Sequence, residues 1–202
     1  MSVERGRDWG GTGPLPEGTV IVSTNAELRS VVVDARRAGR DPPVVGLRGG
    51  DLWRTLGGRE PDHVYVDQVT LATVDIGSAL LDGRIHWFVA QLVVRRSWLY
   101  GRCWIAANAA HLGAWNLAPR AHPGDGLLDV LDSDLPIGQR IEARRRLRRG
   151  DHLPHPAITY RRLAAAQVEF DRPLPVHLDG ERVDSVRSLS VRIEPSGLQV
   201  AL

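Results

Sequence analysis

Two short segments of the sequence place carboxylates beside glycine, where they could bind a metal ion or accept a proton. The first, Ala118–Val130 (APRAHPGDGLLDV), contains Asp125, and the second, Val176–Glu181 (VHLDGE), contains Asp179 and Glu181. Apolar residues typical of strands flank both segments, so the acids would lie at strand ends. Carboxylates there suit Mg²⁺ binding or general-base chemistry. The same Asp-Gly pairs also make ordinary hairpin turns, and the residues alone leave both alternatives open.

The length and composition are those of a soluble globular protein with one sizeable domain, or with one domain and a small appendage. Apolar residues make up 43% and charged residues 25% of the 202 positions,. No apolar run approaches the roughly 18 residues of a membrane span, and no segment resembles a signal peptide. The single Cys103 excludes an internal disulfide framework and fits a reducing compartment,. We therefore expect a cytoplasmic protein, with peripheral contact at the inner face of the membrane as a further expectation.

The charged residues exclude several mechanisms. All 26 basic residues are arginine, and the net charge is only +2. Nucleic-acid binders usually carry a larger positive excess on one face, so we expect no nucleic-acid partner. The absence of lysine excludes a Schiff-base lysine and a P-loop lysine. Any phosphate must be held by arginine, backbone amides or a metal ion.

The order of predicted elements indicates two lobes. Residues 1–18 are rich in glycine and proline and are expected to form a flexible leader. Residues 19–60 alternate short strands with helices, which predicts a small α/β lobe. Within it, Thr24 and Glu27 have the spacing of a capping box, which predicts a helix from about residue 25 to residue 38,.

From residue 61 to residue 202 the pattern changes to β. Short apolar segments are separated by Asp-Gly and Pro-Ser-Gly turns, which predicts a larger antiparallel lobe folded as a sandwich or open barrel. Only residues 140–149 (RIEARRRLRR) favour a helix in this half. The predicted fold class is α+β.

Several motifs in order and spacing resemble bacterial diacylglycerol kinase and sphingosine kinase-like lipid kinases. The strongest similarity is C-terminal, in Asn108–Val130, Arg149–His155 (RGDHLPH), VHLDGE and residues 189–202 (LSVRIEPSGLQVAL). The N-terminal lobe is similar in altered form. Ser23–Glu27 (STNAE) stands where the family has a GGDGT loop, and Gly46–Gly58 (GLRGGDLWRTLGG) stands where it has GTGND.

The resemblance implies ATP-dependent phosphorylation of a lipid hydroxyl. It assigns Glu181 as the base, with Asp179 beside it, and it implies a Mg²⁺ site at Asp125, the backbone carbonyl of Leu127 and the position of His122. Since Mg²⁺ prefers oxygen ligands, the imidazole of His122 is a poor donor, although its carbonyl oxygen could serve.

The resemblance also implies nucleotide contacts at Thr24, Asn25, Gly49, Gly50 and Asp51. A glycine-rich loop lets backbone amides approach phosphate oxygens, whereas the side chains of residues 24–27 would fill that space. We therefore expect that this loop does not bind ATP in the manner of the family. Two hypotheses follow: a divergent lipid kinase, or a catalytically silent lipid-binding or regulatory module.

The remaining candidates concern lipid contact. Arg144, Arg145 and Arg148 lie on the predicted helix and either form a solvated surface or contact anionic head groups. Tryptophans such as Trp98 and Trp115 either line a lipid cleft or belong to the core. The sequence leaves open a homo-oligomer and a partner chain that completes the nucleotide site.

Overall fold

The computed structural model of the chain describes residues 10–58 and 68–202. Residues 1–9 of the expected leader and the expected lobe boundary at residues 60–61 lie outside the described ranges. The boundary itself therefore stays a prediction.

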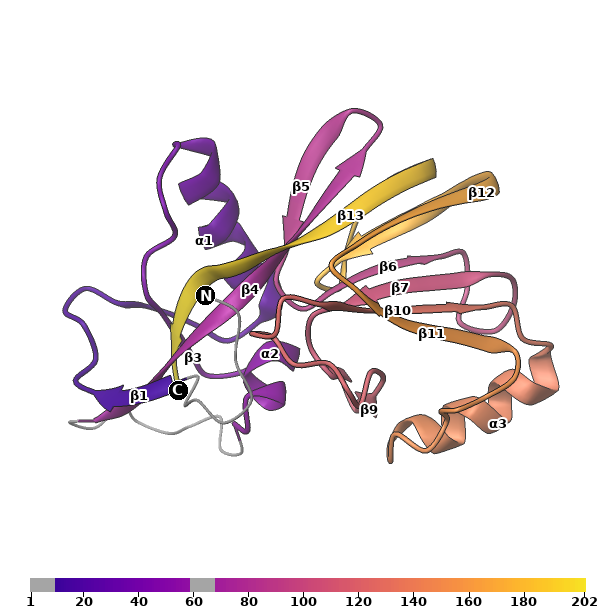
Figure 1. The fold of residues 1–202 in the computed structure, drawn as a ribbon, viewed down its shortest axis with the longest axis horizontal. Coiled ribbons are helices and arrows are strands. Elements are labelled where there is room, and N and C mark those ends of the chain that lie inside the picture. The colour runs from indigo at the N-terminus through magenta and orange to yellow at the C-terminus, as the bar shows by residue number, and fades with distance from the viewer. Residues whose placement is uncertain (1–9, 59–67) are drawn as a thin grey trace.

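One large sheet runs through the described residues, and Figure 1 shows its strands crossing the whole molecule. The neighbour order along its main path is β1-β4-β13-β12-β6-β7-β10-β11, with β5 on β4 and β2 on β3. The strands are β1 (Gly10–Gly13), β2 (Val20–Val22), β3 (Val45–Leu47), β4 (Val69–Leu81), β5 (Arg84–Phe88), β6 (Gln91–Arg95), β7 (Cys103–Ala107), β10 (Leu128–Ser133), β11 (Ile158–Leu163), β12 (Ala165–Leu178) and β13 (Glu181–Ala201). A separate hairpin pairs β8 (His111–Leu112) with β9 (Trp115–Asn116).

The small α/β lobe has the predicted elements. Strands β2 and β3 are parallel, and between them runs α1 (Asn25–Arg37), followed after β3 by α2 (Gly50–Thr55). The predicted capping box is confirmed, because Thr24 accepts a hydrogen bond from the Glu27 amide while Glu27 accepts one from the Thr24 amide. The apolar face of α1 is buried against the sheet, as its 3.6-residue period requires,.

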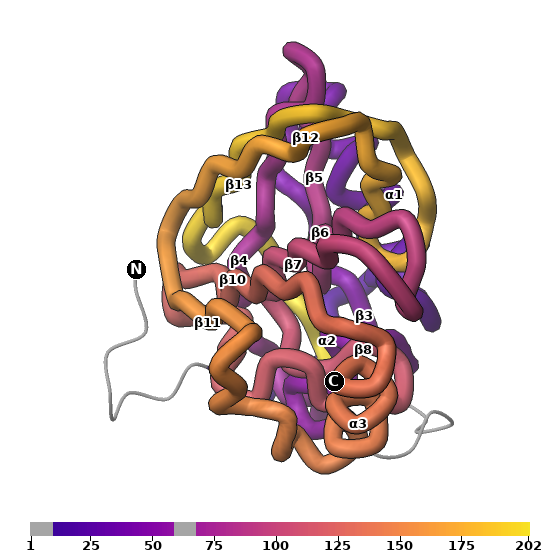
Figure 2. The backbone as a smooth tube through the Cα atoms, turned by 90° about the vertical axis from the view of Figure 1, so that its right-hand side faces the viewer, coloured from indigo at the N-terminus to yellow at the C-terminus, as the bar shows by residue number. Residues whose placement is uncertain are grey.

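Strand β13 joins the two lobes into one sheet. It pairs antiparallel with β12 and β4 along most of its 21 residues, and its end pairs parallel with β3 through Val200 and Val45. The backbone of the other β-lobe strands curves round, as Figure 2 shows. Buried side chains of these strands form one shared apolar core. The predicted sandwich or open barrel of antiparallel strands is confirmed.

Three details differ from the sequence-based expectations. Gly10–Gly13, expected in the flexible leader, form β1 against β4. The apolar run at residues 87–94, expected as one strand, is broken between β5 and β6 at Val89 and Ala90, whose amides donate to Asp179 instead of to a neighbouring strand. Helix α3 (Ile137–Leu147) begins and ends earlier than expected, and none of its residues is fully buried.

Candidate functional site

Asp179, predicted beside the catalytic base, is a buried structural acid. Its carboxylate accepts hydrogen bonds from the amides of Val89, Ala90 and Gln91 at 2.9, 2.8 and 3.1 Å. Burial raises the pKa of Asp179 to about 6, and those three amides offset part of the rise,. With only 6% of the residue exposed, Asp179 holds the β5–β6 connection in place through these hydrogen bonds.

Glu181, the candidate base, forms an ion pair with Arg29 of α1. The glutamate side chain is 61% exposed, whereas that of Arg29 is 14% exposed. Both line a cleft of about 670 Å³ between α1, β5 and the start of β13, together with His86 and Trp87. Glu181 therefore lies in a cleft, as a base would need. Its carboxylate is paired with the Arg29 guanidinium, however, and this pairing competes with acceptance of a proton from a substrate,.

Two loops were expected to contact a nucleotide, the first at residues 23–27 and the second at residues 46–51. Side chains hold these two loops to each other. Asn25, 7% exposed, accepts from the Asp51 amide at 2.9 Å and donates through its own Nδ2 to Asp51 Oδ2 at 2.9 Å. The other Asp51 oxygen accepts from the Gly113 amide at 2.6 Å. Burial raises the pKa of Asp51, and these hydrogen bonds lower it in part. Asn25 and Asp51 thus use their polar atoms to join α1 to α2.

The glycines of the second loop are close to protein atoms. A Cβ on Gly49 would lie 2.5 Å from the Ser23 carbonyl oxygen, and one on Gly50 would lie 2.5 Å from Asn25 Oδ1. Gly50 also has a φ of +91°, which favours glycine,. The space beside each glycine is therefore occupied by the first loop, and Thr24 and Asn25 serve as cap and bridge. These residues do not fit ATP in the manner implied by the resemblance.

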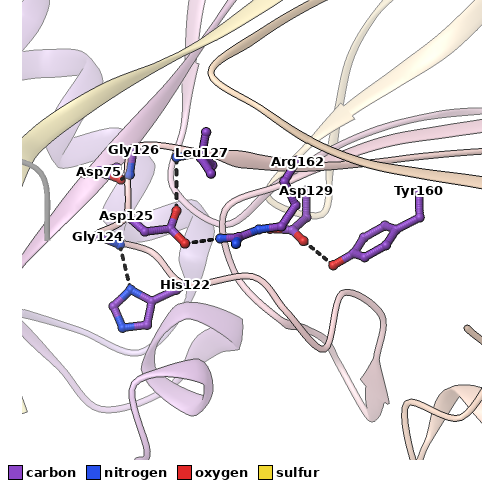
Figure 3. A network of polar contacts seen from close by, with 9 residues as sticks. All are labelled: Asp75, His122, Gly124, Asp125, Gly126, Leu127, Asp129, Tyr160 and Arg162. Atoms are coloured by element: carbon purple, nitrogen blue, oxygen red, sulfur yellow. Dashed lines mark hydrogen bonds and ion pairs between the residues drawn. The ribbon is translucent and has the colours of Figure 1, made fainter. Parts of the chain in front are cut away.

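The expected metal ligands are also engaged with other groups (Figure 3). One oxygen of Asp125 accepts from the Leu127 amide at 3.1 Å, and the other forms an ion pair with Arg162 of β11. The imidazole of His122 accepts from the Gly124 amide at 3.3 Å, and its carbonyl oxygen accepts from that amide at 2.8 Å. No cluster of three or more His, Cys, Asp or Glu side chains able to hold a metal occurs among the described residues. The donor set does not fit Mg²⁺.

Arg162 connects Asp125 to a second carboxylate, Asp129. Asp129 is fully buried on β10, directly opposite Arg162 in the β10–β11 ladder, and its Oδ2 lies 3.6 Å from Arg162 Nε. Its other oxygen accepts a hydrogen bond from the Tyr160 hydroxyl. Burial raises the pKa of Asp129, while Tyr160 and Arg162 counteract the rise; burial and this carboxylate raise the pKa of Tyr160.

Asp75 is a further buried acid that the sequence patterns did not single out. It lies on β4, is 1% exposed, and accepts from the amides of Gly126 and Ser196 at 2.7 and 2.8 Å. Burial raises its pKa, partly offset by these amides. The one signal available was an acid inside an otherwise apolar strand pattern. Arg29 and Arg162 carried no local signal, because each is one arginine among many and its partner is distant in the chain.

A different surface combines arginines with exposed apolar side chains. Helix α3 and the segment around Trp98 enclose a cleft of about 550 Å³ whose lining includes Trp115, Arg144, Arg145 and Arg148. Trp98 packs edge-on against Trp115 at 5.1 Å between ring centroids, and the Arg144 guanidinium lies 5.1 Å from the Trp115 ring. The predicted helical arginines and two of the tryptophans are thus brought together.

Ile137 and Ile141 of α3 are 61% and 47% exposed on this surface, and Leu99 beside them is 48% exposed. Beneath α3 lies a small cavity of about 70 Å³, lined mainly by apolar side chains such as Ile105, Leu131 and Leu147. In the described residues, no helix is both long enough and apolar enough to cross a membrane.

The antiparallel β lobe with its two acid-bearing turns defines a protein of the β-sandwich class. Residues 85–202, more than half of the chain, match the family described as the YegS C-terminal NAD kinase beta sandwich-like domain, and the chain belongs to that family. No curated protein matches the chain.

Crystal structures from Bacillus anthracis str. Sterne share the fold at low sequence identity. One, provisionally described as a diacylglycerol kinase, superposes with a TM-score of 0.67 at 12% identity, over 90% of this chain and 77% of its own. Another, described as a diacylglycerol kinase, superposes with a TM-score of 0.52 at 12% identity, over 79% of this chain and 66% of its own. The fold likeness extends to the small α/β lobe, because the first superposition covers nine-tenths of the chain.

Proposed function

We propose that this protein is a lipid-binding module of the lipid kinase-like family that binds anionic lipid through α3 without transferring phosphate. The observation that carries the proposal is the cleft at α3, where arginines, tryptophans and exposed isoleucines occur together. The absence of catalysis is supported by the internal partners of four predicted site residues, Asn25, Asp51, Asp125 and Glu181.

The chemistry of the α3 surface suits the interface of a bilayer. Arg144, Arg145 and Arg148 supply positive charge that attracts anionic head groups, each worth about 1 kcal/mol near a charged membrane surface. Ile137 and Ile141 supply apolar area, and interfacial helices bind through such area together with charge,.

The cavity beneath α3 provides space for part of an acyl chain. At about 70 Å³ it holds only a few methylene groups as it stands, and its lining from β7, β10 and α3 is mostly apolar,. Because α3 has no fully buried residue, it can separate from the sheet at a lower cost than a core helix,. We propose that the lipid head group lies over the arginines and the chain enters under α3.

Sedimentation with liposomes tests this proposal. Vesicles containing about one-third anionic lipid should carry the protein into the pellet, and purely zwitterionic vesicles should carry much less. Replacement of Arg144, Arg145 and Arg148 by glutamine should lower binding to anionic vesicles by about tenfold or more. Absence of binding to anionic vesicles at low salt would overturn the proposal.

A matched variant controls for net charge. Arg40, Arg172 and Arg187 are exposed on other surfaces, and their replacement by glutamine removes the same three charges. This variant should bind anionic vesicles nearly as well as the unmodified protein. Equal losses in the two triple variants would show that binding follows net charge and not the α3 surface.

ATP-dependent phosphorylation of a lipid hydroxyl is the second candidate function, favoured by the location of Glu181 in an open cleft and by the family. Labelled ATP with Mg²⁺ and mixed lipid extract would yield labelled phospholipid if the protein is a kinase, and Glu181→Gln would abolish the product. Failure of this reaction together with binding to anionic vesicles is the result expected of a silent module.

A further inference from the structure

We propose that the Arg162 guanidinium takes the place of a divalent cation between Asp125 and Asp129, so that this part of the fold is held by a built-in cation. The inference concerns the metal-side network of Figure 3 and is independent of lipid binding. It predicts a latent cation site that opens only when Arg162 is removed.

The backbone register places Arg162 between the two acids. Asp129 and Arg162 are directly opposite each other on β10 and β11, and Tyr160 lies two residues before Arg162 on the same strand. From there the guanidinium reaches Asp125 with one nitrogen and approaches Asp129 with another. One planar cation therefore contacts two carboxylates from different parts of the Asp-Gly segment.

Asp129 needs such a cation more than an exposed acid would. Asp129 is fully buried, and among the described residues no hydrogen-bond donor contacts its Oδ2. Without a nearby cation a charge at this position would be costly, since the Tyr160 hydroxyl donates only to the other oxygen, Oδ1, and leaves the desolvation of Oδ2 without compensation,. Asp125, with 21% of its side chain exposed, adds a second negative charge next to it.

Two other charged groups lie near this network: the Arg120 guanidinium, 5.9 Å from the Tyr160 ring, and the carboxylate of Asp75. Asp75 lies close enough for its pKa to be raised by Asp125, and its own oxygens accept backbone amides. Arg162 is thus the cation that the two acids share. If the guanidinium is removed, the space it occupies keeps a carboxylate of Asp125 and one of Asp129 at its edges, and such hard oxygen donors are the ligand type that Mg²⁺ and Mn²⁺ prefer,.

Thermal melting with and without divalent cations tests the inference. The unmodified protein should melt at the same temperature in EDTA and in millimolar Mg²⁺ or Mn²⁺. Arg162→Met keeps the length of the side chain and removes the charge, and should lower the melting temperature by about 5 °C in EDTA. Millimolar Mn²⁺ should restore part of that loss in a saturable way, and Asp129→Asn added to Arg162→Met should abolish the restoration.

Arg161→Met is the matched control, because Arg161 is exposed on the same strand and its removal changes the net charge equally. It should remain insensitive to cations. If Arg162→Met fails to fold in EDTA, refolding in the presence of Mn²⁺ should recover folded protein. Saturable stabilisation of the unmodified protein by Mg²⁺, or no response to Mn²⁺ in Arg162→Met under either protocol, overturns the inference.

Discussion

Arg29 on α1 and Glu181 at the start of β13 form an ion pair although 152 positions separate them in the sequence. The pair lies across the cleft between the small α/β lobe and the β lobe. Glu181 is the residue that the family resemblance assigns as the base. Its partner Arg29 is a cation on α1, the helix that follows the altered nucleotide loop.

The Arg29–Glu181 pair should contribute little to stability. Because the Glu181 side chain is 61% exposed, solvent screens the attraction, and the coupling energy should be about 0.5 kcal/mol,. A double-mutant cycle with Arg29→Met and Glu181→Gln, measured by urea unfolding, gives this value directly. A coupling energy of about 2 kcal/mol or more would show that the pair holds the two lobes together.

Asp179 should make stability depend on pH between its two pKa values. The pKa is 3.8 for an ordinary Asp and about 6 in the fold, so the folded state binds more protons in this window. The contribution is therefore full below pH 3.8 and is lost as pH rises to about 6, by at most about 3 kcal/mol,. The difference in unfolding free energy between the unmodified protein and Asp179→Asn should follow this curve.

A carboxyl NMR titration provides a check on Asp179 that needs no variant. Its midpoint should lie near 6, and a midpoint near 3.8 would contradict the expected pH dependence.

Gly50→Ala and Gly57→Ala should separate backbone strain from steric contact. Both glycines have positive φ, +91° and +97°, so each substitution costs about 1 kcal/mol in strain,. Only at Gly50 would the added Cβ meet Asn25 Oδ1 at 2.5 Å, whereas nothing lies within 4 Å at Gly57. Gly50→Ala should therefore be the more destabilising by at least about 1 kcal/mol in urea unfolding. Equal effects would mean that the two loops are not packed together.

Thr24→Ala should destabilise the protein by about 1 kcal/mol, because Thr24 caps α1 and its hydroxyl accepts the Glu27 amide,. Ser30→Ala, on the exposed part of the same helix, is the control and should have almost no effect. Calorimetric titration with Mg²⁺ and ATP should show no saturable binding to either variant or to the unmodified protein. Loss of measurable ATP binding in Thr24→Ala alone would instead assign Thr24 to a nucleotide site.

Local sequence patterns predicted helix starts and turns well where a residue's own type fixes the local backbone conformation. The capping box at Thr24 predicted the start of α1. The Asp-Gly turns expected in the β half include Asp82-Gly83, which joins β4 to β5 with positive φ at both residues. The break at Val89 could not be predicted in this way. It depends on a carboxylate 90 positions later in the chain, and the apolar run itself favours one continuous strand.

Two acids of the candidate region could be predicted from the sequence, but the buried Asp75 and the partners of all these acids could not. Asp125 and Glu181 carry the visible Asp-Gly signature. The cations that engage them, Arg162 and Arg29, are selected by strand register and helix packing, which no local spacing reveals. The sequence therefore left the roles of Asp125 and Glu181 undecided. In the structure each of them forms an ion pair with an arginine of the same chain.

The long strand β13 also constrains how the molecule can assemble. It provides a sheet neighbour for β12, for β4 and for the parallel strand β3, so its pairings connect residues distant in the chain. Neither lobe can complete its sheet until this strand has been synthesised. We expect slow folding with a late, concerted closing step, and earlier exposure of the unpaired edges of β3 and β4 to chaperones.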